Sequence, residues 1–231
     1  MIDFEEGHTF LIDKPFGWSS FQLVKKVRYL TKVKKVGHAG TLDPLATGLM
    51  IICTGKNTKK IQQYQDQNKT YTGIIRLGST TPSYDLETEI NKTFPTAHIN
   101  TKKISDAVGK LTGKILQNPP ACSAIKINGE RAYLSARKGN IEPLPAREVF
   151  IENFDVEDAL FPDIQFTIRC SKGTYIRSIA DTLGKLLDSG AHLAKLCRTH
   201  IGMYDLKDAE SIRNFENRIK TNKSTTPQKE K

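Results

Sequence analysis

The 231-residue sequence has only four cysteines, and they are far apart along the chain. Cys53, Cys122, Cys170 and Cys197 form no C-x-x-C pair, the spacing that is typical of structural zinc sites and of redox motifs. A disulfide framework, which needs closely spaced cysteines in a short secreted chain, is not indicated either. We therefore expect reduced thiols and a cytoplasmic protein.

Long apolar runs are also missing. No segment approaches the eighteen consecutive apolar residues that a membrane-spanning helix requires. The N-terminus, MIDFEEGHTFLIDKPFG, lacks the basic region and apolar run of a secretory signal. The sequence thus predicts neither a membrane span nor export.

Acidic residues are outnumbered by basic ones, with 25 Asp and Glu against 35 Lys and Arg and a formal net charge of +10. An anionic partner is the first expectation from this excess, and nucleic acid leads the candidates. Solubility alone would also account for a modest basic excess. The 38% hydrophobic and 26% charged content is that of a globular protein, long enough for one large domain or two small ones.

Hydrophobic periodicity predicts short strands mixed with helices. A strand at 8–12 is followed by a helix that starts near Ser19 and Ser20 and has Phe21, Val24, Val27 and Leu30 on its apolar face. Further strands are predicted at 49–53, 69–78, 150–160, 163–170 and 192–206, and helices at 58–68, 101–111 and 174–190. Adjacent strands without a strict alternation of strand and helix favour an α+β fold with a mixed, largely antiparallel sheet.

Two segments stand apart from this pattern. Residues 118–147 are rich in Pro and Gly and predict a projecting basic arm, with Lys126, Arg131, Arg137, Lys138 and Arg147. Residues 213–231 are polar and Lys-rich, and we expect a disordered tail. The exposed face of the first helix carries Lys25, Lys26 and Arg28.

The segment GHAGTLDPLATG (37–48) surrounds Asp43 with turn-forming residues. Pro44 biases Asp43 away from the helical region, and the glycines permit positive φ or close approach. A rigid loop then presents one carboxylate just ahead of a buried strand, as catalytic loops often do. An Asp before Pro also commonly stabilises a turn, so the segment alone leaves both roles open.

The segment KGTYIRSIADTLG (172–184) places Tyr175 and Arg177 at a strand-to-helix junction. Backbone amides beside an arginine suit a phosphate or a carboxylate, although Tyr175 could equally be a core residue and Arg177 part of a solvated face. The chain has no G-x-x-x-x-G-K-[ST] or G-x-G-x-x-G nucleotide-binding pattern. His38 and Asp43 lack the further ligands that a metal site would need.

Together these segments closely resemble the TruB family of tRNA pseudouridine synthases. The block G-H-x-G-x-L-D-P-x-A-x-G is highly specific, and the K-G-T-Y-I-R block supports it. The resemblance extends over most of residues 8–205, in LIDKPFGWSS (11–20), KVGHAGTLDPLATGLMIICTGKNTKKI (35–61), KTYTGIIRLGSTT (69–81), NPPACSAIKINGERAYLSARKG (118–139) and CSKGTYIRSIADTLGKLLDSGAHLAKLCRT (170–199).

The resemblance implies a fold and a reaction. The expected fold is the pseudouridine synthase catalytic domain over residues 1–212, with helices flanking the sheet, an active-site cleft across it and no PUA-type domain after it. The expected reaction is isomerisation of the uridine at tRNA position 55, in the TΨC loop, to pseudouridine. The family uses no cofactor and no metal, and a monomer is expected.

The resemblance also implies the reacting residues. Asp43 matches the catalytic aspartate, Tyr71 the tyrosine that stacks on the target base, and Arg177 the arginine that pairs with the aspartate. These three form the expected catalytic set.

The remaining matches concern substrate binding. Tyr175 and Leu196 resemble residues that line the uracil pocket, and His38 resembles the histidine that contacts RNA near the extruded base. Lys14, with Pro15, matches the K-P of the N-terminal motif, for which we expect structural support of the site.

The basic arm at 118–147 is expected to contact the RNA. Departures from the family pattern affect such contacts. Cys122 stands where relatives often have an aromatic residue, and TTPSYDLET (80–88) departs from the usual T-x-T-x-D-x-x-G run. A non-catalytic tRNA-binding protein or folding chaperone is the alternative, but the acid at position 43 argues against it. A zinc deaminase would need H-x-E and P-C-x-x-C patterns, which this sequence lacks.

Overall fold

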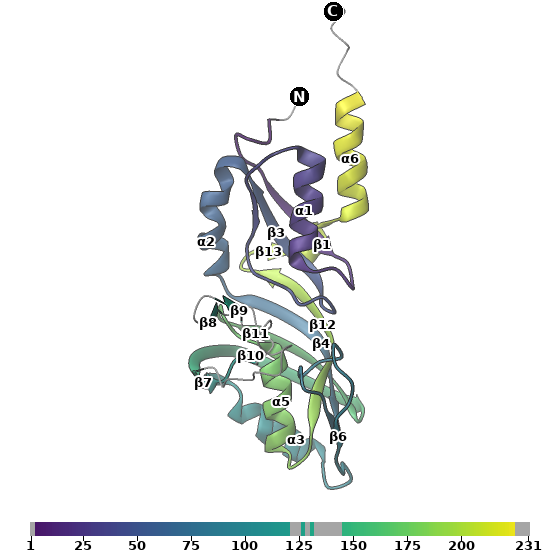
Figure 1. The fold of residues 1–231 in the computed structure, drawn as a ribbon. Coiled ribbons are helices and arrows are strands. Elements are labelled where there is room, and N and C mark those ends of the chain that lie inside the picture. The colour runs from purple at the N-terminus through teal and green to yellow at the C-terminus, as the bar shows by residue number, and fades with distance from the viewer. Residues whose placement is uncertain (1–2, 121–125, 128–129, 132–144, 225–231) are drawn as a thin grey trace, which may run out of the picture. The chain divides into compact units, whose positions relative to one another are not determined.

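The computed structural model describes residues 3–120, 126–127, 130–131 and 145–224, which form two compact units. Unit 1 comprises Met1–Thr70 and Cys197–Lys231, and unit 2 comprises Tyr71–Leu196 (Figure 1). Strands β4 (Lys69–Leu77) and β12 (Ala191–Ile201) each begin in one unit and end in the other. The region predicted as one catalytic domain is thus built from two compact parts.

Strand β3 (Thr47–Thr54) is the centre of unit 1. It pairs antiparallel with β1 (Thr9–Lys14) and β2 (Val36–His38), and parallel with β12. Strand β14 (Glu210–Ser211) lies parallel to β1, and β13 (Tyr204–Asp205) lies antiparallel to β12. Every β3 residue after Thr47 is buried, as the continuous apolar run LMIIC predicts.

Helix α1 (Ser20–Thr31) begins with a capping box, in which the Ser19 hydroxyl accepts the backbone N–H of Gln22 and the Gln22 side chain accepts that of Ser19. The prediction that Phe21 belongs to the buried face is wrong, because its side chain is 59% exposed. Leu23 is buried instead, and with Val27 and Leu30 it forms the apolar face of the helix that packs against the core.

The C-terminal segment corrects a second prediction. Residues 213–224 are helical, in α6 (Ile212–Ser224), and only 225–231 of the expected tail lie outside the described residues. Phe215 and Ile219 are buried four residues apart on one face of α6. The Phe215 ring meets that of Phe10 edge to face at 5.0 Å between centroids. Two apolar anchors in a polar segment are enough to dock a helix.

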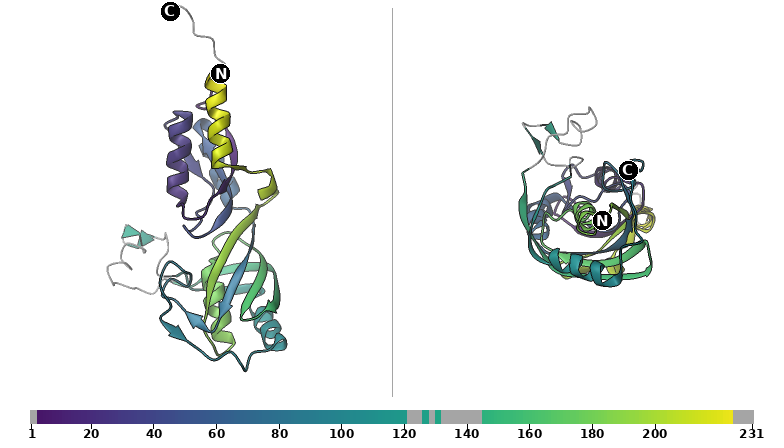
Figure 2. Two further views of the ribbon diagram at one scale, coloured as in Figure 1. Left: turned by 90° about the vertical axis from the view of Figure 1, so that its right-hand side faces the viewer. Right: turned by 90° about the horizontal axis from the view of Figure 1, so that it is seen from below.

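Helices α1 and α6 lie side by side in unit 1 (Figure 2), and an ion pair of 2.6 Å joins Lys26 of α1 to Glu216 of α6. The predicted helix at 58–68 is confirmed as the 3-10 helix η1 (Gly55–Lys60) followed by α2 (Ile61–Gln65). A second 3-10 helix, η2 (Leu206–Asp208), precedes β14.

The sheet strands of unit 2 follow the order β12, β4, β11, β10, β7. Strand β10 (Arg147–Leu160) lies antiparallel to both β11 (Asp163–Cys170) and β7 (Gly113–Gln117). The face of β11 predicted to be apolar is buried, at Ile164, Phe166, Ile168 and Cys170. The α+β class with a mixed, mostly antiparallel sheet is therefore confirmed.

Two helices complete unit 2: α3 (Thr101–Lys110), capped by Asn100, and α5 (Ile176–Leu186). Two short ladders accompany them, β5 (Ser79–Thr80) with β6 (Lys92–Thr93), and β8 (Lys126–Ile127) with β9 (Glu130–Arg131). Most of the predicted basic arm, including Cys122, Arg137 and Lys138, lies outside the described residues. In the part of the chain that the structure describes, no helix is long and apolar enough to cross a membrane.

The packing of α6 yields a stability prediction. Phe215→Ala removes a side chain that is 0% exposed, and should lower the free energy of unfolding by about 3 kcal/mol or more. Urea denaturation followed by circular dichroism measures this change. Arg213→Ala, at an exposed position of the same helix, should change stability by less than about 0.5 kcal/mol. Equal effects of the two substitutions would contradict the docking of α6.

Candidate active site

The loop that carries Asp43 is a tight turn directly before β3. The backbone N–H of Ala46 donates to the Asp43 carbonyl at 3.1 Å, and Pro44 occupies the second turn position. Asp43 itself is half-buried. Gly48, at the start of β3, has φ +104°, and a Cβ there would lie 2.4 Å from the Arg198 carbonyl oxygen. Glycine is therefore required at this end of the loop for both conformation and space.

Lys14, the last residue of β1, supports the loop from the side of the sheet. Its side chain is 0% exposed, and its Nζ donates to the carbonyls of Trp18 at 2.6 Å, Pro15 at 3.1 Å and Pro44 at 3.3 Å. The Gly17 N–H donates to the same Pro44 carbonyl at 2.9 Å. These contacts place the Lys14 ammonium beneath the loop, and its part in substrate binding stays a prediction.

Ser20, the first residue of α1, holds the residue that precedes the aspartate. Its hydroxyl donates to the Leu42 carbonyl at 2.9 Å and accepts the Leu42 N–H at 2.8 Å. These two hydrogen bonds are buried and satisfy both backbone polar groups of Leu42. The orientation of Asp43 is therefore tied to the start of α1.

Arg198 is the residue of unit 1 that the sequence reading missed. It is 1% exposed and donates Nε to the Leu49 carbonyl at 2.8 Å, Nη2 to that of Gly40 at 3.1 Å and Nη1 to that of Thr41 at 3.5 Å. The guanidinium thus joins backbone on both sides of Asp43. Its sequence context, KLCRTH (195–200), is a mixture of polar and apolar residues and offers no local signal of this role.

The ionisation of Lys14 depends on burial and on its charged neighbours. Burial lowers the pKa of Lys14 to about 8, and repulsion from Arg198 adds to the decrease. The nearby Asp43 carboxylate opposes it by favouring the charged ammonium. The arrangement therefore places an acid and two cations close together in unit 1.

His38, the last residue of β2, lies near the same arginine. Burial lowers its pKa below the ordinary value of 6.5, repulsion from Arg198 lowers it further, and a hydrogen bond with the Gly40 backbone partly opposes the change. The imidazole is therefore neutral at pH 7. Its Nδ1 is buried and has no hydrogen-bond partner among the residues that the structure describes.

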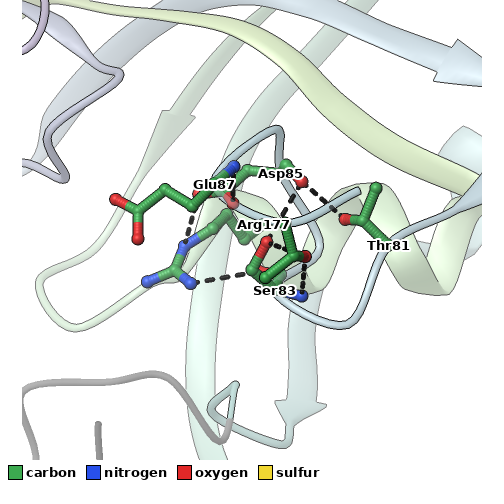
Figure 3. Close-up of polar contacts among 6 residues, drawn as sticks. Thr81, Ser83, Asp85, Glu87 and Arg177 are labelled. Atoms are coloured by element: carbon green, nitrogen blue, oxygen red, sulfur yellow. Dashed lines mark hydrogen bonds and ion pairs between the residues drawn. The ribbon is translucent and has the colours of Figure 1, made fainter. Parts of the chain in front are cut away.

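In unit 2, Arg177 is buried in the first turn of α5, with 4% of its surface exposed. The reading of Arg177 as part of a solvated face is wrong. Its Nε lies 3.7 Å from a carboxylate oxygen of Asp85, which is also 4% exposed, and its Nη1 donates to the Ser83 carbonyl at 3.1 Å (Figure 3). Asp43 belongs to unit 1, so its pairing with Arg177 stays a prediction.

Asp85 is the missed residue of unit 2, and its own loop holds it firmly. The hydroxyls of Thr81 and Ser83 donate to the Asp85 carbonyl at 2.6 and 3.1 Å, and the Glu87 N–H donates to its carboxylate at 3.0 Å (Figure 3). A fixed carboxylate restricts the orientation of the guanidinium that it faces. The run TTPSYDLET contains this acid, although the sequence reading treated the run only as a departure.

The other predicted residues of unit 2 are Tyr71, Tyr175 and Leu196. Tyr71 in β4 is 9% exposed, and Leu196 in β12 is half-buried. Tyr175 caps α5; its N–H donates to the Gln117 side chain at 2.7 Å, and the Gln117 amide donates back to its carbonyl at 3.0 Å. The Arg147 guanidinium lies 4.7 Å from the centroid of the Tyr175 ring.

A metal centre has no support in this arrangement. Within residues 3–120 and 145–224 and the two short ladder strands between them, no three His, Cys, Asp or Glu residues are grouped as metal ligands. The expectation that neither metal nor cofactor takes part stays a prediction.

Residues 28–176 match the model of the N-terminal domain of the TruB family of pseudouridylate synthases. The chain belongs to this family. It is 52% identical to the tRNA pseudouridine synthase B of Flavobacterium johnsoniae over 93% of this chain and 96% of that protein. It is 47% identical to the enzyme of the same name from Phocaeicola vulgatus, over 93% and 94% of the two chains.

Two solved structures share the fold of this chain. One chain of a Cbf5-Nop10-Gar1 complex matches with a TM-score of 0.70 at 23% identity, over 93% of this chain. One chain of an H/ACA RNP bound to a substrate RNA containing 2′-deoxyuridine matches with a TM-score of 0.72 at 21% identity, over 98% of this chain. This chain spans 54% and 57% of those two proteins, and the likeness is one of fold.

Arg198 provides a test of how this TruB-family loop is held. Arg198→Met leaves three backbone carbonyls without their buried donor and should lower the free energy of unfolding by about 3 kcal/mol. Because the guanidinium disfavours the imidazolium, its loss should also raise the pKa of His38. NMR titration of the His38 ring measures this pKa.

Arg198→Lys is the control, because it keeps the charge but not the fork of donors. This variant should lose stability while the pKa of His38 stays low. An unchanged pKa of His38 in Arg198→Met would contradict the electrostatic link between the two residues.

Proposed function

We propose that this chain is a tRNA pseudouridine synthase that isomerises uridine 55 in the TΨC loop, with Asp43 as its catalytic carboxylate. The observation that carries the proposal is the Asp43 loop: the family's G-H-x-G-x-L-D-P block folds into a turn that Lys14, Ser20 and Arg198 hold rigidly. Membership of the TruB family and two relatives named tRNA pseudouridine synthase B support the reaction and the substrate.

The reaction explains the need for one fixed acid. The bond between N1 and C1′ of the nucleotide must break, the uracil must turn, and a bond from C5 to C1′ must form. The C5 proton leaves and N1 takes up a proton, so the product is an isomer of the substrate. A carboxylate can attack the sugar, remove the 2′ proton to give a glycal, or add to the base. Each route begins with an ionised Asp43 aimed in one direction, and the loop geometry supplies that direction.

The family resemblance assigns further roles to residues of unit 2. Tyr71 would stack on the uracil face, so that the detached base turns without escaping. Tyr175 and Leu196 would line the pocket around the base. Arg177 would favour the ionised form of Asp43 by pairing with it, and Asp85 holds its guanidinium in place.

His38 is assigned to the RNA side of the loop. The neutral imidazole of the half-buried His38 has one donor and one acceptor nitrogen, so the ring can form a hydrogen bond to a nucleotide. Extruding the uridine from its stack costs roughly a few kcal/mol, which contacts to phosphate and base must offset. We further propose that the protein acts as a monomer in the cytoplasm, without metal or cofactor.

A release assay with tRNA transcript tritiated at uridine C5 tests the proposal, because joining C5 to the sugar must expel that hydrogen. The wild type should release tritium, and Asp43→Asn should release none above the background without enzyme. Asp208→Asn, at an exposed acid of unit 1, should release tritium at the wild-type rate. A wild type that binds the tRNA but retains its tritium would favour the alternative, a non-catalytic tRNA-binding protein or folding chaperone.

A further inference from the structure

Helix α1 and its C-cap residue present an exposed row of aromatic and basic side chains, which we call the α1 stripe: Phe21, Lys25, Arg28 and Tyr29 of the helix, and Lys32 at the C-cap. All five are exposed, and Phe21 and Tyr29 are 59% and 66% exposed. Spacings of three and four residues place them on one face of the helix. The opposite face is buried through Leu23, Val27 and Leu30, so the two rings on the stripe are not needed to dock α1.

Each ring of the stripe holds one lysine. The Lys25 ammonium lies 4.6 Å from the centroid of the Phe21 ring, and the Lys32 ammonium lies 4.3 Å from that of Tyr29. A cation over an aromatic face is attracted by the ring quadrupole. The rings therefore restrict two flexible lysines and keep their charges at defined places along the helix.

The stripe carries positive charge without acidic neighbours in sequence. Helix α1 contains no Asp or Glu, and within the described part of the chain Lys25, Arg28 and Lys32 form no ion pair. Lys26 differs, because it lies 2.6 Å from Glu216 of α6 and its charge is already matched. Lys25 and Lys26 are adjacent in sequence, but only Lys25 belongs to the stripe.

The stripe is continuous with the Asp43 loop. It begins at the residue after Ser20, whose hydroxyl holds Leu42 next to Asp43. From Phe21 to Lys32 the helix rises by about 17 Å. The chain then passes exposed Lys34 and Lys35 on its way to His38. Both ends of α1 thus connect to residues of the proposed site.

We propose that the α1 stripe binds the sugar-phosphate backbone of the RNA that carries the target uridine. This inference rests on the proposed function, which supplies the polyanion. A row of unpaired cations in the unit that holds Asp43 is complementary to successive phosphates. A membrane surface fits less well, since the apolar face of α1 is buried in unit 1 and cannot enter a bilayer.

Salt-dependent binding of tRNA tests the inference. The variant Lys25→Gln, Arg28→Gln, Lys32→Gln should bind at least about tenfold more weakly near 0.1 M salt. Its plot of log K against log salt should be shallower by about 2 to 3, because up to three phosphate contacts are lost. Tritium release at saturating tRNA should change little, because the stripe acts in binding.

A matched control removes the same charge elsewhere. Lys92→Gln, Lys103→Gln, Lys110→Gln changes three exposed lysines of unit 2 that, like those of the stripe, form no ion pair within the described part of the chain, and it should leave the affinity and the salt slope near those of the wild type. An equal loss with both triple variants would overturn the inference, because net charge alone would then explain binding.

The rings are tested separately from the charges. Tyr29→Ala should weaken tRNA binding a few-fold, whereas Tyr29→Phe keeps a ring beneath Lys32 and should bind like the wild type. Loss of binding in Tyr29→Phe would contradict the role of the ring as a support for the lysine.

The outcomes for the stripe and for the reaction can be distinguished. If the wild type releases tritium and the stripe variant binds tRNA with unchanged affinity and slope, the inference is wrong and the proposed function stands. If the wild type shows the predicted salt dependence but releases no tritium, the proposed function fails and the stripe remains an RNA-binding surface. If the stripe variant binds tRNA like the wild type but no longer binds an acidic protein, the stripe is a protein-binding surface and the inference is wrong.

Discussion

The buried contacts between two cations and the backbone carbonyls of the Asp43 loop are the interaction on which the site depends. An irregular loop leaves carbonyls outside helix and sheet ladders, and an unpaired buried polar group costs about 1–3 kcal/mol. Lys14 and Arg198 supply charged donors to carbonyls before and after the aspartate. Charge-assisted hydrogen bonds are stronger than neutral ones, so the loop can be both irregular and rigid.

The same cations shape the electrostatics around Asp43. Arg198 holds the loop and also lowers the pKa of His38, so support of the backbone and neutrality of the imidazole have one cause. A buried charged residue also orients a site residue in unit 2. Asp85 is fixed by its own loop and in turn orients Arg177. Arg198 positions the Asp43 loop in unit 1, and Asp85 positions Arg177 in unit 2. Neither Arg198 nor Asp85 has a part in the proposed chemistry.

Local sequence patterns predicted most of the fold, because apolar periodicity and turn residues act over short distances. The strands at 49–53 and 163–170 and the helix capped at Ser19 follow from such patterns. The predictions for Phe21 and for residues 213–224 were wrong, because burial depends on what packs against a helix. Leu23, and not Phe21, lies on the buried face of α1. In α6, Phe215 is buried against Phe10. Arg198 and Asp85 were missed for a related reason, as their partners are distant in sequence. The roles of Asp43, Tyr71 and Arg177 came from the family resemblance and remain predictions.

The central claim is that a rigidly held Asp43 converts one uridine of the TΨC loop. The most direct measurement maps pseudouridine in a tRNA transcript after incubation with the protein, using carbodiimide modification and primer extension. We expect a single stop that reports position 55 with the wild type, and no stop with Asp43→Asn. Pseudouridine at another position, or formed equally well by Asp43→Asn, would contradict it.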